Sequence, residues 1–166
     1  MRCAFKDGIP VIYVDETMFT KRAMIDGEYS RRYSNIHVEE KDVLTGYIAA
    51  IAAVSAERGL ELVHTHSCPI NEESFTEFIE DLHSRHDGKP IAVFMDNARY
   101  HLSYTNAAKL KGTSVRPIYN VPYAPQYNPI EGCFSVVKNH FKRARLNALA
   151  RSLPFSSQRA VRQAFN

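Results

Sequence analysis

The sequence has no long apolar run and no recognisable export signal, which excludes two classes of protein. No apolar stretch approaches the ~20 residues that a membrane-spanning helix needs. The first residues lack the charged and then apolar pattern of a secretory signal. We therefore expect a soluble intracellular protein.

Cysteine is scarce as well. The three cysteines, Cys3, Cys68 and Cys133, are too few and too far apart for a disulfide framework or for paired zinc ligands. We expect reduced thiols, with Cys68 and Cys133 part-buried. At 166 residues and 45% hydrophobic content, the chain is long enough for one domain with a real core.

Acidic residues are absent after Glu131, so the two signs of charge are separated along the chain. The net charge is only +3, yet all seven charged residues beyond Glu131 are basic: Lys138, Lys142, Arg143, Arg145, Arg151, Arg159 and Arg162. A basic segment that follows an acidic site indicates that the basic side chains bind the backbone of a polyanion beside a metal centre. A solvated helix face is the alternative.

Three apolar segments have the composition of strands. Residues 9–16 (IPVIYVDE) are nearly continuous in apolar character, which predicts a strand buried on both faces that ends at Asp15. Residues 90–95 (PIAVFM) predict a second such strand, which closes on Asp96. Residues 114–121 (SVRPIYNV) predict a third buried strand, and the proline within it favours a place near the sheet edge.

The remaining segments predict a hairpin and several helices. Residues 43–55 and 60–66 flank a short connection that ends in glycine, as in a β-hairpin. Residues 17–42 are polar and indicate a turn with a short or irregular strand. Helices are expected over 71–86, over 103–110, and from Ser156 or Ser157 onward. The sequence stops within this last helix, so we expect a piece of a longer protein.

The segment from Pro122 to Lys138 (PYAPQYNPIEGCFSVVK) presents one acid at the start of a helix. Its three prolines restrict the shapes that the loop can take. We expect Asn128 to cap the helix, Pro129 to take the first helical position and Glu131 to lie in the first turn. The backbone would then hold this carboxylate in place, although complementing the helix dipole is an ordinary alternative.

Three acids, Asp15, Asp96 and Glu131, are candidate metal ligands. An acid at the end of a buried strand is costly unless it binds a cation or accepts hydrogen bonds. Oxygen ligands alone favour Mg²⁺ or Mn²⁺ over zinc, and three carboxylates can hold two such ions. Phosphodiester cleavage or transfer is the reaction that fits.

Two histidine pairs are alternative metal ligands. His64 with His66, and His83 with His86, have the spacing to bind one metal ion together. Each pair supplies only two ligands without evident partners. Ordinary surface or edge histidines are the simpler interpretation.

Three motifs, VDET at 14–17, DNARYH at 96–101 and YAPQYNPIE at 123–131, resemble in this order the DDE catalytic domain of the mariner-like (Tc/mariner) transposase superfamily. Between Asp96 and Glu131 lie 34 residues, the interval of the glutamate-bearing branch of that superfamily. The resemblance covers about residues 9–145. It implies an RNase H-like α/β fold, with a mixed five-stranded sheet and helices on both faces.

The resemblance also implies an activity. A transposase core of this kind hydrolyses phosphodiesters at transposon ends and transfers the freed strand into target DNA. It uses two Mg²⁺ or Mn²⁺ ions, here on Asp15, Asp96 and Glu131. The implied partners are double-stranded DNA and further copies of the chain, as a homodimer or larger synaptic complex. The implied location is the nucleus in a eukaryote, or otherwise the cytoplasm or nucleoid.

Two other functions stay open at this point. One is a domesticated, transposase-derived subunit that binds or processes DNA without transposing. The other is an RNase H-like nuclease. The chain has no tryptophan, Phe134 stands where one is expected after the glutamate, and no helix-turn-helix region is evident, so DNA sequence recognition by this chain alone is in doubt.

Several further residues are candidates for the site. Asn97 and His101 match the positions after the second acid, where they either position DNA or water, or only cap and pack. We expect Asn128 to support the site. Lys138 lies two turns after Glu131 and matches a basic position of the family motif. We expect it to bind DNA together with Lys142, Arg143 and Arg145. The expected domains are a catalytic domain over 1–150 and a basic helical extension over 151–166.

Overall fold

The computed structural model describes residues 8–19, 48–99, 101, 114–122 and 124–165. The predictions for residues 20–47, for the helix over 103–110 and for Cys3 lie outside the described residues.

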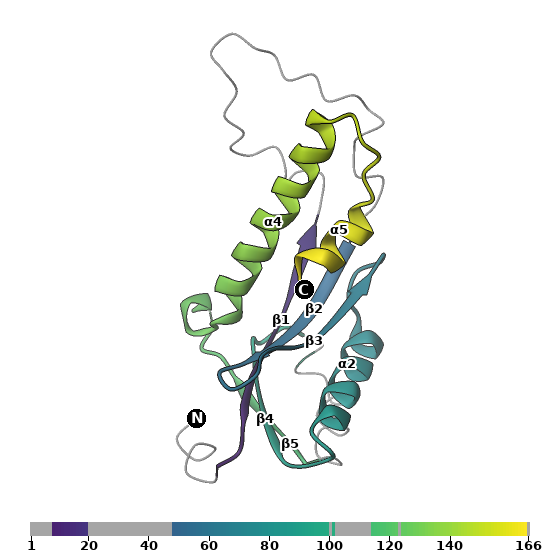
Figure 1. Ribbon diagram of the computed structural model, residues 1–166. Coiled ribbons are helices and arrows are strands. Elements are labelled where there is room, and N and C mark those ends of the chain that lie inside the picture. Colours follow the sequence, from purple (N-terminus) through teal and green to yellow (C-terminus); the bar gives the residue numbers. More distant parts are fainter. Residues whose placement is uncertain (1–7, 20–47, 100, 102–113, 123, 166) are drawn as a thin grey trace.

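A mixed five-stranded sheet forms the centre of the molecule, in the order β3-β2-β1-β4-β5 (Figure 1). β1 pairs antiparallel with β2, and β2 with β3, whereas β4 runs parallel to both β1 and β5. The strands are β1 (Val11–Phe19), β2 (Ile48–Ser55), β3 (Gly59–His66), β4 (Ile91–Met95) and β5 (Val115–Tyr119). The predicted RNase H-like α/β fold class is confirmed.

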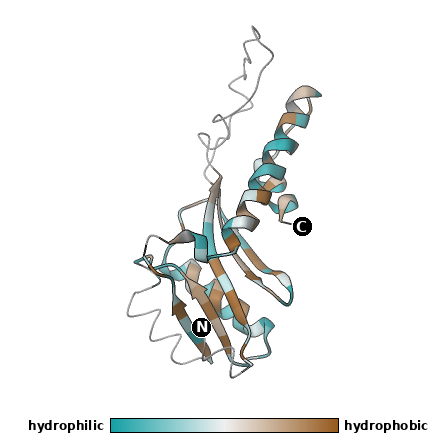
Figure 2. Cartoon of the chain, turned by 90° about the vertical axis from the view of Figure 1, so that its left-hand side faces the viewer, coloured by the Kyte–Doolittle hydropathy of each residue, from teal (hydrophilic) through white to brown (hydrophobic). Residues whose placement is uncertain are grey.

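Helices cover both faces of this sheet. On one face, α2 (Glu72–Arg85) packs its stripe of Phe75, Phe78, Ile79 and Leu82 against the strands. On the other face, α4 (Ile130–Ala150) and α5 (Ser157–Ala164) enclose a second apolar cluster. A short 3-10 helix, η3 (Pro125–Tyr127), precedes α4. Apolar residues accordingly concentrate along the strands, and hydrophilic and hydrophobic residues alternate along α4 (Figure 2).

β1 is longer than the sequence predicts. Its pairing with β2 continues to Phe19, which lies opposite Ile48, so Asp15 is in the middle of the strand and not at its end. Successive strand residues point to opposite faces. Val14 belongs to the cluster under α2, and Phe19 to the cluster under α4. Asp15 therefore faces α4, and its neighbour Glu16 faces the α2 side.

α2 begins where the sequence predicts. The side chain of Asn71 accepts a hydrogen bond from the amide of Ser74, and the Ser74 hydroxyl accepts one from the amide of Asn71. This reciprocal capping satisfies two amides that the first turn leaves open. The hairpin is also confirmed, with Gly59 at φ +69° beginning β3.

Two predictions of burial are wrong. β5 is an edge strand, as its proline predicts, but Arg116 and Pro117 are exposed and only Val115 of this strand is buried. Cys68 and Cys133 are exposed. Cys68 lies in the loop after β3, and Cys133 lies on the outer surface of α4.

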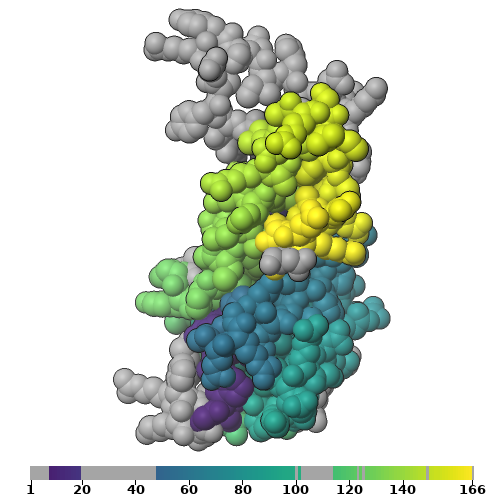
Figure 3. All heavy atoms as spheres, in the orientation of Figure 1, coloured from purple at the N-terminus to yellow at the C-terminus, as the bar shows by residue number. Residues whose placement is uncertain are grey.

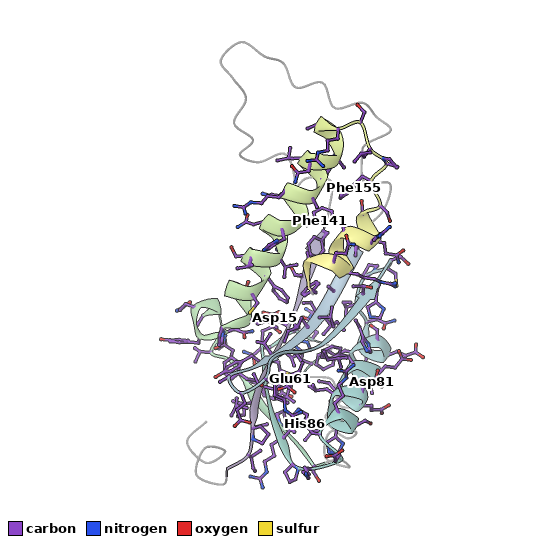
Figure 4. The ribbon with its side chains drawn as sticks, viewed as in Figure 1. Asp15, Glu61, Asp81, His86, Phe141 and Phe155 are labelled. Carbon is purple, nitrogen blue, oxygen red and sulfur yellow. The ribbon has the colours of Figure 1, made fainter. Side chains whose placement is uncertain are left out.

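α5 begins at Ser157, with Ser156 as its cap. Just before it, Phe155 packs on Phe141 of α4, with 5.7 Å between the ring centroids (Figure 4). The two helices lie side by side over the upper part of the sheet (Figure 3). None of the helices in the described ranges has the length and apolarity to cross a membrane.

Candidate active site

The register of two parallel strands brings the two aspartates together. Tyr13 of β1 lies opposite Phe94 of β4, and both strands run in the same direction. Two residues further along each strand are Asp15 and Asp96. Asp96 directly follows β4, where the strand has ended and its side chain is half-exposed.

The start of α4 brings the third acid to the same place. The amide of Glu131 donates to the carbonyl of Asn128 at 3.2 Å, and the amide of Gly132 donates to Pro129 at 3.2 Å, which forms the first turn. A cavity of about 480 Å³ lies between this turn and the strand ends. Its lining includes three carboxylates and three asparagines: Asp15, Asp96, Glu131, Asn97, Asn120 and Asn128.

Asp15 is the most buried of the three acids and is hydrogen-bonded on both oxygens. Oδ1 accepts from the amide of Glu16 at 2.8 Å, and Oδ2 accepts from Asn128 Nδ2 at 3.0 Å. Burial raises the pKa of Asp15 to about 7, and the negative charges of Glu16, Glu131 and Asp96 add to that rise. A nearby cation would offset these charges and favour the ionised form.

Asn128 does not cap α4 with its side chain, contrary to the prediction. Its Nδ2 points back to Asp15, and its Oδ1 is buried without a hydrogen-bond partner in the described part of the chain. An amide that served as the cap would accept from the first helical turn through that oxygen. The side chain instead joins the cavity-facing side of β1 to the start of α4.

Asp96 has a different environment. Its Oδ1 accepts from the amide of Ala98 at 2.8 Å and lies 2.8 Å from Nδ1 of His101. The hydrogen bond from His101 holds the pKa of Asp96 below its ordinary value. Asp96 is therefore ionised under conditions in which Asp15 is partly protonated.

His101 is fully buried between two acids. Its Nε2 lies 2.9 Å from Oε1 of Glu16, and its Nδ1 faces Asp96. Burial by itself lowers the pKa of His101, but the hydrogen bonds to Asp96 and Glu16 outweigh it and raise the pKa to about 9. The ring therefore packs in the core and is also held by the acids beside the cavity.

Sequence reasoning missed Glu16 and Asn120. Glu16 follows Asp15 in a strand, so it must face the opposite, apolar side, where an acid needs a partner. That signal was available in the sequence. Asn120 is buried and its Nδ2 donates to the carbonyl of Ala124 at 2.8 Å, bracing the loop before α4. Nothing in the sequence distinguishes it.

Asn97 ties this loop to the strand ends. Its Nδ2 donates to the carbonyl of Asn120 at 2.7 Å, while the amide of Asn120 donates to the carbonyl of Met95 at 2.8 Å. The Asp96 side chain, rather than that of Asn97, caps the turn at Ala98. Asn97 is part of the cavity lining and part of its support.

The donor set fits divalent cations that prefer oxygen. In the described residues, no group of three or more His, Cys, Asp and Glu is arranged to hold one ion. Carboxylates taken in pairs remain, which is the number that Mg²⁺ ordinarily takes alongside water and substrate oxygens. Burial first, and then the charges of Glu16, Glu131 and Asp96, raise the pKa of Asp15, and a cation bound beside it would oppose that rise.

One histidine of each pair outside the cavity bonds to an acid, whereas Nε2 of His66 and Nε2 of His83 are buried without a hydrogen-bond partner in the described part of the chain. His64 Nε2 lies 3.1 Å from Asp81, and His86 Nε2 lies 2.7 Å from Glu61. Figure 4 shows His86 and Glu61 near one another, at the lower end of α2. The acid contact of His64 agrees with the simpler interpretation, whereas His86 is buried and is not a surface histidine.

The four basic residues predicted to bind DNA all lie on α4. Lys138, Lys142 and Arg145 are half-buried, and Arg143 is exposed. Lys138 lies two turns beyond Glu131 and is not among the residues that line the cavity. The DNA-binding role of these residues stays a prediction.

Comparison with known proteins agrees with this geometry. Residues 10–152 match the family described as DDE superfamily endonuclease. No curated protein sequence matches the chain. Among solved structures, the simian T-cell lymphotropic virus intasome in complex with the PP2A regulatory subunit B56 gamma has a chain of similar fold, with a TM-score of 0.65 at 14% identity. The match covers 95% of this chain and 48% of that chain.

Proposed function

Because the chain belongs to the DDE superfamily of endonucleases, we propose that it is the catalytic core of a DNA transposase of the mariner-like branch. The observation that carries the proposal is that Asp15 of β1, Asp96 just after β4 and Glu131 of α4 line one common cavity. The motifs around these acids and the 34 residues between the last two support the mariner-like branch.

Two Mg²⁺ or Mn²⁺ ions are the proposed cofactors. The charges of both other acids act on Asp15 and help to raise its pKa, and the resemblance to the mariner-like domain implies that Asp15 would serve both ions. Asp96 would be the second carboxylate that holds one ion, and Glu131 would be the second carboxylate that holds the other ion. Bound there, the ions would activate a nucleophilic oxygen and stabilise the leaving oxygen of a phosphodiester.

The residues of the chain supply position and charge. Asn128 holds Oδ2 of Asp15, and the backbone of the first α4 turn holds Glu131. Hydrolysis at a transposon end frees a 3′-hydroxyl, and the same site then directs that hydroxyl to target DNA. Neither step needs a covalent bond between DNA and protein.

The proposed partner is double-stranded DNA. The basic residues of α4 continue away from Glu131 along one helix, so a phosphate backbone that enters the cavity would meet them next. Transposition joins two DNA ends, so we also propose that the chain works as a homodimer or larger assembly.

Metal binding and cleavage test the proposal directly. Wild-type protein should bind Mn²⁺ in calorimetry and nick duplex DNA only when Mg²⁺ or Mn²⁺ is present. Asp15→Asn, Asp96→Asn and Glu131→Gln should each reduce cleavage by at least ~100-fold, with folding checked by circular dichroism. Glu80→Gln is the control, because Glu80 is exposed on α2, across the sheet from the cavity.

The same assay separates the neighbouring functions. Cleavage that survives in all three variants would refute the assignment of the site. Preference for RNA–DNA hybrids over duplex DNA would favour an RNase H-like nuclease. Metal and DNA binding without cleavage or strand transfer would favour a domesticated subunit.

A further inference from the structure

We propose that Glu16 and His101 form a positioning pair that holds the Asp96 carboxylate from the opposite face of the sheet. This inference rests on the proposed function, in which Asp96 is a metal ligand. Glu16 has no place among the three acids of the cavity, since it points from β1 toward the α2 side. Its contact with His101 gives it an indirect connection to that cavity.

The geometry of the His101 ring carries the argument. Nδ1 lies 2.8 Å from Oδ1 of Asp96, and Nε2 lies 2.9 Å from Oε1 of Glu16. An ionised carboxylate only accepts hydrogen bonds, so each ring nitrogen must donate. The ring is therefore a rigid link with two defined ends.

The pair is held in a dry environment. The His101 side chain is 0% exposed and that of Glu16 is 13% exposed. The ring packs on Phe75 of α2, with 4.3 Å between centroids, and the Tyr119 hydroxyl donates to the carbonyl of His101 at 3.2 Å. Both α2 and β5 thus fix the position of the ring.

Asp96 needs such support because it lies just past β4. Its side chain is 53% exposed, and its Oδ1 takes both described hydrogen bonds, from Ala98 and from His101. In the described part of the chain Oδ2 accepts no hydrogen bond, so it is the oxygen left for a cation. Residues that orient a metal ligand typically affect metal affinity by ~10–100-fold.

A second buried pair supplies a matched control. His86 Nε2 lies 2.7 Å from Oε2 of Glu61, and their side chains are 6% and 3% exposed. This pair joins the end of α2 to β3 and is outside the cavity. Like the pair of Glu16 and His101 it is a buried contact between a histidine and a glutamate, although Arg58 also lies 3.9 Å from Glu61, and it has no metal ligand at its end.

The experiment compares the two pairs. His101→Phe keeps a ring against Phe75 but cannot hydrogen-bond, and Glu16→Gln keeps an acceptor but loses the charge. Calorimetry with Mn²⁺, well below the unfolding temperature, should show affinity about 10-fold lower for His101→Phe and about 3-fold lower for Glu16→Gln. His86→Phe and Glu61→Gln should lower the Tm and leave Mn²⁺ affinity within about 2-fold of wild type. If the variants of both pairs change the Tm alike and none changes Mn²⁺ affinity, the pair of Glu16 and His101 is only structural and the proposal is overturned.

A metal-free measurement keeps this inference separate from the proposed function. The Ala98 amide donates to Oδ1 of Asp96, so its proton shift and exchange rate report the orientation of that carboxylate. His101→Phe should move the Ala98 signal and speed its exchange in protein without metal, whereas His86→Phe should not. If wild-type protein binds no Mn²⁺, the proposed function fails and the Ala98 signal still decides on the pair. An unchanged Ala98 signal in His101→Phe would overturn the pair, and Glu16→Gln gives the same readout if His101→Phe does not fold.

Discussion

At Asp15 the protein disfavours a charge that the proposed chemistry requires. The side chain is buried beside three other acids, and its pKa rises to about 7. Asp96, which lies at the more exposed end of β4, has a lowered pKa because His101 donates to it. Two carboxylates in one cavity thus differ in protonation because one is more buried and the other accepts a hydrogen bond from His101.

This difference predicts that removing the Asp15 charge stabilises the metal-free protein at high pH. The folded pKa of about 7 exceeds the reference value of 3.8, so the stabilisation is present below pH 3.8 and is lost as the pH rises through 7. Asp15→Asn has no such loss. The gap in unfolding free energy between variant and wild type should grow from about pH 5 to about pH 8 by ~1–3 kcal/mol, which is less than the ~4 kcal/mol that corresponds to a pKa raised from 3.8 to about 7.

Denaturant titrations in EDTA at both pH values measure this gap. Glu80→Gln, on exposed α2 surface, should show no growth of the gap. Added Mn²⁺ should stabilise the wild type and not Asp15→Asn, since a ligand that binds only the folded state stabilises it. A gap that is the same at the lower and the higher pH would contradict the assigned burial of charge.

Among the elements, the loop before α4 determines where the third acid lies. Asn128 joins Oδ2 of Asp15 to the turn that carries Glu131, and Asn120 braces the loop through Ala124. The sequence indicates the stiffness of this loop through its prolines, but it does not indicate these side-chain partners. The position of Glu131 therefore depends on side-chain hydrogen bonds as well as on backbone stiffness.

We expect Asn128→Ala to weaken metal binding more than it weakens the fold. A hydrogen bond to a charged group contributes ~1.5–3 kcal/mol, and its loss here frees one oxygen of Asp15 to reorient. Mn²⁺ affinity in calorimetry should fall about 10-fold. Asn147→Ala is the control, because Asn147 is exposed on the same helix. Equal Mn²⁺ affinity of the two variants would show that Asn128 does not orient Asp15.

Elements with a local pattern were predicted well from the sequence. Asn71 caps α2 and Ser156 caps α5 close to the predicted starts of these helices, because capping residues and apolar periodicity can be recognised within a few residues of sequence. The predicted end of β1 was wrong because pairing with β2, which begins at Ile48, sets it. The predicted burial of β5 was wrong because an edge position depends on the order of all five strands.

At the scale of the whole molecule, the sheet register assembles the site. The motifs predicted that Asp15, Asp96 and Glu131 belong to one site, and the three acids line one cavity. The link from Glu16 to His101 spans 85 positions in the sequence. It depends on β1 and β4 lying side by side and on α2 covering one face of the sheet. No local sequence pattern predicts this long-range packing.

The distribution of charge over the molecule yields a last prediction. Lys142 and Arg143 extend from the cavity along α4, away from the acids, so DNA whose phosphate backbone reaches the cavity should neutralise them. Each phosphate that a side chain neutralises adds ~0.9 to the steepness of log affinity against log salt for duplex DNA. Lys142→Ala with Arg143→Ala should therefore reduce that steepness by ~1.8 and weaken binding alike for all sequences.

Fluorescence anisotropy of a labelled duplex over a range of salt concentrations measures this slope. The control combines Arg58→Ala with Lys89→Ala, which removes the same charge from exposed side chains. Arg58 follows β2 and Lys89 precedes β4, so both lie at the sheet end opposite Asp96. If the control reduces the slope as much as the α4 variant does, DNA binding depends on net charge alone. The surface of α4 beside the acids is then not the DNA-binding surface.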